Sequence, residues 1–107
     1  MKITIKNHEY EIEIKEKSKD NLLGQIQNGG YYDNIKQKPA GKNKIILYGE
    51  EIGSQTFWHE ITHCIFAILS SSVDGRIAQK VYHNERIIDS VADMILEVNK
   101  QINKQQT

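Results

Sequence analysis

The apolar residues between Ser54 and Ser70 recur at steps of three and four, and this spacing most restricts the folds open to the chain. Such spacing places apolar side chains on one broad face of an α-helix, which then has to pack against another element. The residues are Phe57, Trp58, Ile61, Cys64, Ile65, Ile68 and Leu69. Ser54 stands where a helix N-cap is expected. The pattern predicts a helix from Ser54 to about Ser70, with Phe57, Trp58 and Cys64 as core residues.

A second amphipathic helix is predicted near the C-terminus, capped by Asn84. Its apolar positions are Ile87, Ile88, Val91, Ala92, Ile95, Leu96, Val98 and Ile102. The residues after position 102 are polar, and we expect them to fray. Between the two helices, the polar stretch 70–76 interrupts the pattern, and the pattern of residues 77–83 does not decide between helix and loop.

Residues 1–16 alternate between apolar and polar side chains, which predicts the two strands of a β-hairpin. We expect Asn7 and His8 to form the tight turn. The outer face of the hairpin would pair Lys2 and Lys6 with Glu11 and Glu13.

The middle of the chain, residues 17–44, is polar and contains turn clusters at 28–30 and 38–43. Between these clusters, residues 31–37 could form a short strand. Residues 44–50, KIILYGE, are a compact apolar run bounded by turn residues, which predicts a further strand. Together the patterns predict an α+β fold, in which an N-terminal hairpin and a small, mostly antiparallel sheet pack on the two helices.

Length and composition bound the class of protein. A chain of 107 residues forms one small domain, here expected over 1–107. Its 14 basic and 14 acidic side chains cancel, which argues against nucleic acid as the main partner. No run of apolar residues is long enough to cross a membrane, and the N-terminus lacks an apolar signal core. A single cysteine excludes a disulfide framework, so we expect a cytoplasmic protein.

The most informative motif is His-Glu-x-x-His at residues 59–63. One helical turn separates His59 from His63, so both imidazoles can bind the same metal ion. Glu60 follows the first histidine, where its carboxylate can take a proton from a water molecule that the metal activates. This chemistry needs a third protein ligand and one open position at the metal. The alternative is a surface helix whose two histidines are unrelated.

The third ligand should lie downstream on another element. The candidates are Asp74, His83, Glu85, Asp89, Asp93 and Glu97. Glu85 and Asp89 lie one helical turn apart and share a face, so one can bind metal while the other orients a ligating histidine. His83 would instead complete a site of three histidines.

The two motifs together, HEITH at 59–63 and NERIID at 84–89, resemble the gluzincin metallopeptidases, which combine His-Glu-x-x-His with a downstream Asn-Glu-x-x-x-Asp. The order of elements looks like that of minimal, single-domain gluzincin-like proteins of phages and mobile elements. The resemblance in layout covers nearly the whole chain, and the specific match is confined to the two motifs.

The resemblance implies one zinc ion per chain, bound by His59, His63 and Glu85, with Glu60 as the general base. The expected activity is hydrolysis of peptide bonds in a protein or peptide substrate. The resemblance also implies that Asp89 hydrogen-bonds a ligating histidine, most readily His59.

Three further expectations follow from the resemblance. Asn84 would support the ligands together with Asp89. The strand at 44–50 would be the sheet edge along which an extended peptide is bound. In larger gluzincins, an extra domain supplies a Tyr or His that stabilises the transition state. Here Tyr82, His83 or Arg76 could substitute, and Tyr82 is the candidate we assign.

Two other functions compete with the peptidase. A small domain has little wall around a substrate, and a partner protein could complete the cleft. Alternatively, the chain is a catalytically idle binding module that keeps zinc as a structural staple and docks a partner protein. The intact Glu60 favours catalysis, because a structural site needs no acid beside its first ligand and usually has four protein ligands. A third interpretation, a metal-free helical domain, predicts no response to a chelator.

Overall fold

The computed structural model describes residues 1–17, 20–27, 32–33, 38–39, 43–72 and 75–106. The chain forms two compact units, Met1–Glu50 and Glu51–Thr107. Among the described residues, the strands lie in the first unit and the helices in the second. The predicted α+β class is confirmed. The expectation of a single domain over 1–107 stays a prediction.

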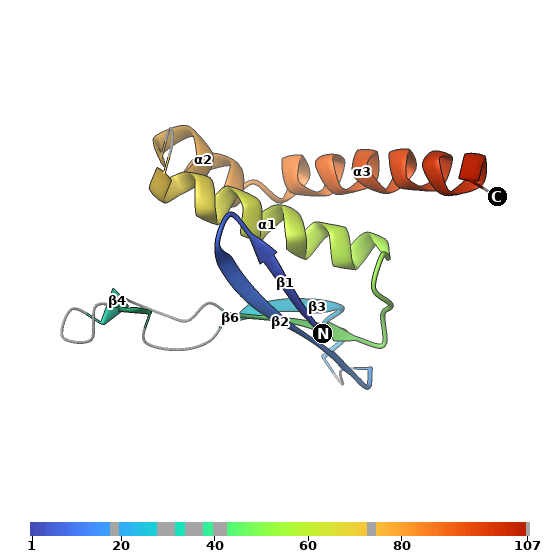
Figure 1. Cartoon of the computed structure of the whole chain (residues 1–107), viewed down its shortest axis with the longest axis horizontal. Helices are drawn as coiled ribbons and strands as arrows, with labels where there is room; N and C mark the ends of the chain where they lie inside the picture. Colours follow the sequence, from blue (N-terminus) through green and yellow to red (C-terminus); the bar gives the residue numbers. More distant parts are fainter. Residues whose placement is uncertain (18–19, 28–31, 34–37, 40–42, 73–74, 107) are drawn as a thin grey trace. The chain divides into compact units, whose positions relative to one another are not determined.

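The first unit is built on a four-stranded sheet in the order β1-β2-β6-β3 (Figure 1). Its strands are β1 (Lys2–Ile5), β2 (His8–Lys15), β3 (Gly24–Gln27) and β6 (Asn43–Tyr48). β2 and β6 are parallel, and the other two pairs are antiparallel. The short strands β4 (Tyr32–Asp33) and β5 (Lys38–Pro39) pair with each other. The mostly antiparallel sheet is therefore as predicted, with one parallel pair.

The N-terminal hairpin is confirmed, but its turn lies one residue earlier than predicted. Lys6 and Asn7 have positive φ angles of 46° and 69°, as the two central residues of a type I′ turn require. His8 therefore begins β2 and lies outside the tight turn. On the outer face, Lys2 lies opposite Glu11 in register and forms its ion pair with Glu9 at 3.3 Å.

The apolar run at 44–50 does form a strand, β6, but it is not a sheet edge. β6 pairs with β2 on one side and with β3 on the other, so both rows of its backbone groups are used. Ile45 and Leu47 in this strand are fully buried. The expectation that a peptide binds along 44–50 by strand addition is therefore wrong, since such binding needs an unpaired edge.

The polar middle of the chain contains β3, which the sequence pattern did not predict. Gln25 and Gln27 flank Ile26, and this short polar pattern alone is typical of a loop. Pairing with β6 explains the strand, and Tyr48 adds a hydrogen bond from its hydroxyl to Gln25 Oε1 at 2.9 Å. The turn expected at 28–30 and most of the short strand expected at 31–37 lie outside the described residues.

The second unit consists of α1 (Gln55–Ser72), α2 (Gly75–Tyr82) and α3 (Glu85–Gln106). α1 and α3 confirm the two predicted helices. Ser54 caps α1, because its Oγ accepts a hydrogen bond from the Phe57 N–H at 3.2 Å. The ambiguous segment 77–83 belongs largely to α2. The prediction that the C-terminal residues fray is wrong, since α3 continues to Gln106.

Within this unit, α1 contacts both of the other helices. Cys64, Ile88 and Ala92 have no exposed surface, which confirms Cys64 as a core residue. Phe57 is 6% exposed and its ring meets the Trp58 ring edge-on, with 5.0 Å between ring centroids. α3 begins with Glu85, shortly after α2 ends at Tyr82, and it packs against α1 (Figure 1). Among the described residues, no helix has the length and apolarity that a membrane span requires.

Candidate metal centre

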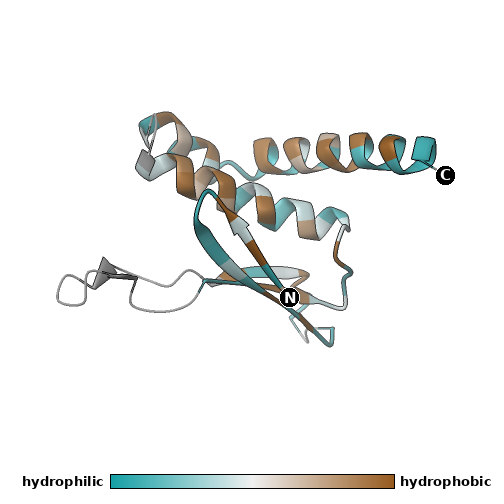
Figure 2. Ribbon diagram, in the orientation of Figure 1, coloured by the Kyte–Doolittle hydropathy of each residue, from teal (hydrophilic) through white to brown (hydrophobic). Residues whose placement is uncertain are grey.

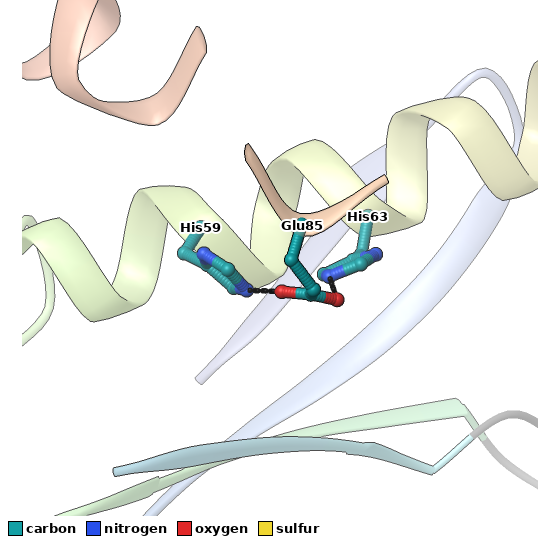
Figure 3. A group of neighbouring side chains, drawn as sticks. All are labelled: His59, His63 and Glu85. Carbon is teal, nitrogen blue, oxygen red and sulfur yellow. Dashed lines mark ion pairs between the residues drawn. The ribbon is translucent and has the colours of Figure 1, made fainter. Parts of the chain in front are cut away.

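Three side chains converge where the first turn of α3 meets α1 (Figure 3). His59 and His63 stand one turn apart on α1, and Glu85 is the first residue of α3. Nε2 of His59 lies 3.0 Å from Glu85 Oε2, and Nε2 of His63 lies 2.9 Å from Glu85 Oε1. One carboxylate thus faces both imidazoles. Among the described residues, this is the group of His, Cys, Asp and Glu side chains whose ligand atoms lie close enough to hold one ion, all within 4.8 Å of one another.

The chemistry of these donors suits a metal ion of the zinc type. Two imidazole nitrogens and one carboxylate are a ligand set that catalytic zinc sites use, with a fourth position left open. Both Nε2 atoms are directed at the same carboxylate, as ligands of a single ion would be. The histidine side chains are only 17% and 11% exposed, whereas Glu85 is 64% exposed. The site is therefore open to solvent on the side of α3.

Asp89 lies one turn after Glu85 and holds His59 from the other side of its ring. Asp89 Oδ1 is 2.5 Å from His59 Nδ1. Accepting a hydrogen bond from Nδ1–H leaves Nε2 as the nitrogen that faces Glu85, so Asp89 selects both the tautomer and the orientation of the ring. Gln55, one turn before His59 on α1, donates a hydrogen bond to the same Oδ1 at 3.4 Å.

His63 sits in a drier environment than His59. Burial lowers the pKa of the His63 ring, an effect that the nearby charge of Glu85 opposes. A depressed pKa favours the neutral imidazole, which is the form that binds metals. Nδ1 of His63 is buried and has no hydrogen-bonding partner among the described residues. The nearby backbone of Tyr82 acts to raise the pKa of the His63 ring, against the effect of burial.

Glu60 is largely buried, with 8% of its surface exposed. Burial raises the pKa of its carboxyl group, His59 lowers it, and the negative charge of Glu85 raises it further. The carboxyl group therefore senses both His59 and Glu85. A carboxyl group held near a metal-type site with a raised pKa is better matched to accepting and returning a proton near neutral pH than an exposed one is.

Tyr82, assigned from the sequence as the stabiliser of a transition state, is the last residue of α2. Its ring meets the His63 ring edge-on at 5.0 Å between centroids, and its other edge contact is with His83 at the same distance. Tyr82 is therefore close to the site, where it supports the His63 ring.

Asn84 caps α3, as the sequence predicted. Its Oδ1 accepts a hydrogen bond from the Ile87 N–H at 3.2 Å, which caps α3. Through this cap, Asn84 fixes the first turn of α3 and with it Glu85. Asn84 thus reaches the ligands through the backbone.

The other candidates for a third ligand do not join the group. His83, Asp93 and Glu97 are exposed and are not among the clustered ligand atoms of the described residues. Asp74 lies outside the described residues, and Arg76 is exposed on α2. Sequence reasoning missed Gln55, although its position four residues before His59, on the same helical face, was a signal that could have pointed to it.

Comparisons with protein-family models, with curated proteins and with solved structures gave no match to this chain.

Proposed function

We propose that this chain is a zinc-dependent metallopeptidase of the gluzincin type, which hydrolyses peptide bonds of a protein or peptide substrate. The observation that carries the proposal is the convergence of His59, His63 and Glu85, from two helices, beside the buried carboxyl group of Glu60. One zinc ion per chain would be held by the two Nε2 atoms and the Glu85 carboxylate. When bound, such an ion polarises a carbonyl group and makes water more acidic.

The residues of the chain supply the rest of the proposed chemistry. Glu60 accepts a proton from the attacking water and passes it to the leaving amine. Asp89 keeps the His59 ring in the tautomer that leaves Nε2 free for the ion, and Gln55 steadies Asp89. Three protein ligands leave room for water and substrate on the exposed side of Glu85.

Metal content of the purified protein is the first test, with Glu85→Ala and the matched control Asp93→Ala on the same helix. We expect about one zinc per chain in the unchanged protein and in Asp93→Ala, and a large loss in Glu85→Ala. Zinc retained by Glu85→Ala would move the third ligand elsewhere, and absence of zinc from all three proteins after zinc is supplied would contradict the proposal.

Catalysis is tested separately with Glu60→Gln, which keeps the shape of the side chain and removes its basicity. The variant should bind zinc like the unchanged protein and lose peptidase activity on a broad peptide library by at least about a hundredfold. Equal cleavage by both proteins would refute the role of Glu60.

One observation favours the second candidate function, a binding module with a structural ion. Tyr82, which was expected to stabilise a transition state, packs edge-on against the His63 ring, a contact that supports a ligand. For such a module, Glu60→Gln would change neither zinc content nor the biological effect of the protein. A peptidase that needs a partner protein to complete its cleft would instead gain activity when that partner is added.

A further inference from the structure

The two histidines of the candidate metal centre differ in what holds their rings. His59 is oriented by Asp89, which contacts the ring nitrogen that faces away from Glu85. The corresponding nitrogen of His63, Nδ1, is buried and makes no hydrogen bond among the described residues. Buried polar atoms are nearly always hydrogen-bonded, so an atom left over in this way needs an explanation. The absence directs attention to the groups that lie beside the His63 ring.

The unpaired nitrogen has to be a donor when the site holds an ion. Nε2 of His63 lies 2.9 Å from Glu85 Oε1, so Nε2 is the ring nitrogen on the side of the other ligands. A neutral imidazole carries one proton, and the nitrogen that binds a metal is the one without it. The proton of His63 then lies on Nδ1. The group that orients this ring must therefore be a hydrogen-bond acceptor.

The C-terminal end of α2 supplies such an acceptor. Tyr82 is the last residue of α2, and the carbonyl groups in the last turn of a helix have no partner within the helix. The Tyr82 ring meets the His63 ring edge-on, with 5.0 Å between ring centroids. Burial is the main influence on the pKa of the His63 ring and lowers it, whereas the backbone of Tyr82 acts to raise it. A backbone group has this effect when it accepts a hydrogen bond from the ring, and the carbonyl oxygen is the backbone acceptor.

Packing against α1 fixes the position of α2. The two helices contact each other, and both carry hydrophobic bands (Figure 2). Ala78 of α2 is buried. At the start of α2, Gly75 lies so close to α1 that an added Cβ would stand 2.4 Å from the carbonyl oxygen of Ser70. Because α2 is held against α1 along its length, its last residue, Tyr82, has a defined place beside His63.

We propose that Tyr82 is the positioning residue of His63. In the zinc-bound protein its backbone carbonyl accepts a hydrogen bond from His63 Nδ1–H, and its ring supports the face of the site formed by the histidine. The inference rests on the proposed metal site and deepens it, since each histidine then has its own acceptor. Asp89 brings a negative charge to His59, whereas the Tyr82 carbonyl orients His63 without one. The hydroxyl group of Tyr82 takes no part in this role.

Zinc affinity of three variants tests the contribution of the Tyr82 ring. Tyr82→Phe keeps the ring and the backbone, so it should bind zinc and cleave peptides like the unchanged protein. Tyr82→Ala removes the ring that holds the end of α2 beside His63, and zinc affinity should fall by about 10- to 100-fold. Lys80→Ala, at an exposed position of the same helix, is the matched control and should leave the affinity unchanged. Competition with a chromogenic chelator measures the affinity, and circular dichroism measures the helix content.

Two outcomes of this comparison would overturn the positioning role. One is zinc affinity of Tyr82→Ala equal to that of the unchanged protein. The other is a Tyr82→Phe variant that binds zinc normally and loses peptidase activity, because the hydroxyl group would then act on the reaction itself.

Nuclear magnetic resonance of the zinc-bound protein tests the hydrogen bond directly. With histidine labelled in both ring nitrogens by ¹⁵N, the His63 ring should show its proton on Nδ1, and this proton should exchange slowly with water. In Tyr82→Phe the signal should be unchanged, since the carbonyl remains in place. A His63 ring with its proton on Nε2, or an Nδ1 proton that exchanges as fast as that of an exposed histidine, would overturn the proposal.

The measurements separate this inference from the proposed peptidase activity. Weaker zinc binding by Tyr82→Ala, in a protein that cleaves no peptide, would support the positioning role and contradict the peptidase. Unchanged zinc binding by Tyr82→Ala, in a protein whose cleavage is lost with Glu60→Gln, would overturn the positioning role and support the peptidase. A chain that binds no zinc after zinc is supplied would overturn both.

Discussion

At the scale of single residues, His59 shows how two motifs far apart in sequence become one device. Its two ring nitrogens face two carboxylates from the first turns of α3, Glu85 and Asp89. HEITH and NERIID predicted this set of neighbours through the resemblance to gluzincins, whereas residue types and spacing alone left several candidates for the third position. The role of Gln55 was not predicted, because its position four residues before His59 indicates a shared helical face but does not identify its hydrogen-bonding partner, Asp89.

Asp89→Asn tests the orienting role of this carboxylate. The amide cannot accept the hydrogen bond of His59 Nδ1–H as strongly, so zinc affinity should fall by about 10- to 100-fold while one zinc still binds. Competition with a chromogenic chelator measures the affinity, and Asp93→Asn serves as the control on the same helix. An unchanged affinity would show that Asp89 does not orient His59.

Glu60→Gln should make the metal-free protein more stable at neutral pH. Burial raises the pKa of Glu60 above its ordinary value of 4.5. Between that value and the raised pKa, the unfolded chain has lost the proton that the folded chain retains, so stability falls as pH rises through this window. Glu60→Gln should lack this fall. Urea unfolding at several pH values measures the stability, with Glu51→Gln at an exposed position as the control. If Glu60→Gln showed the same fall in stability with rising pH as the unchanged protein, Glu60 would not be its cause.

At the scale of elements, helices with a long apolar pattern and a cap were predictable, and short elements were not. α1 and α3 carry their own periodicity and the caps Ser54 and Asn84. α2 is a helix of 8 residues that starts at a glycine, and its few apolar positions fit loop as well as helix. β3 owes its existence to the neighbouring strand β6, a long-range pairing that no local pattern contains.

Asn84→Ala should loosen the first turn of α3 and thereby weaken the metal site. Loss of an N-cap side chain costs about 1 kcal/mol of stability. Since Glu85 follows the cap directly, part of this loss should appear as lower zinc affinity. Thermal unfolding and chelator competition measure the two effects, with the exposed Asn103→Ala as a matched control. A loss of stability without loss of affinity would separate the cap from the site.

At the scale of the whole molecule, the sequence predicted the α+β class but not the division into two units. That division depends on which elements contact one another. The sequence pattern gives the periodicity of each element but does not say which other element it packs against. The strand at 44–50 illustrates the limit: its apolar run predicted the strand correctly, but its central place in the sheet depended on β3.

Removal of metal should destabilise the helical unit. An ion bound by α1 and α3 stabilises only the folded helices, by about 2.7 kcal/mol at a free concentration 100 times its dissociation constant. Addition of EDTA should therefore lower the unfolding temperature followed by helical circular dichroism. In His63→Ala, which lacks one of the proposed ligands, EDTA should not change the unfolding temperature. A chelator effect that survives in His63→Ala would place the responsible ion elsewhere.

The parallel pairing of β2 with β6 has a consequence for how the chain folds. Tyr10 lies beside Asn43 and Lys15 beside Tyr48, so this pair forms only after a long loop has closed. The helices of the other unit rely on contacts nearer in sequence, and folding rates rise as contacts become more local. The helical unit should therefore fold first. Trp58, the single tryptophan, lies on α1 and reports that step in stopped-flow fluorescence. Hydrogen exchange during refolding should then protect the amides of α1 before those of β6.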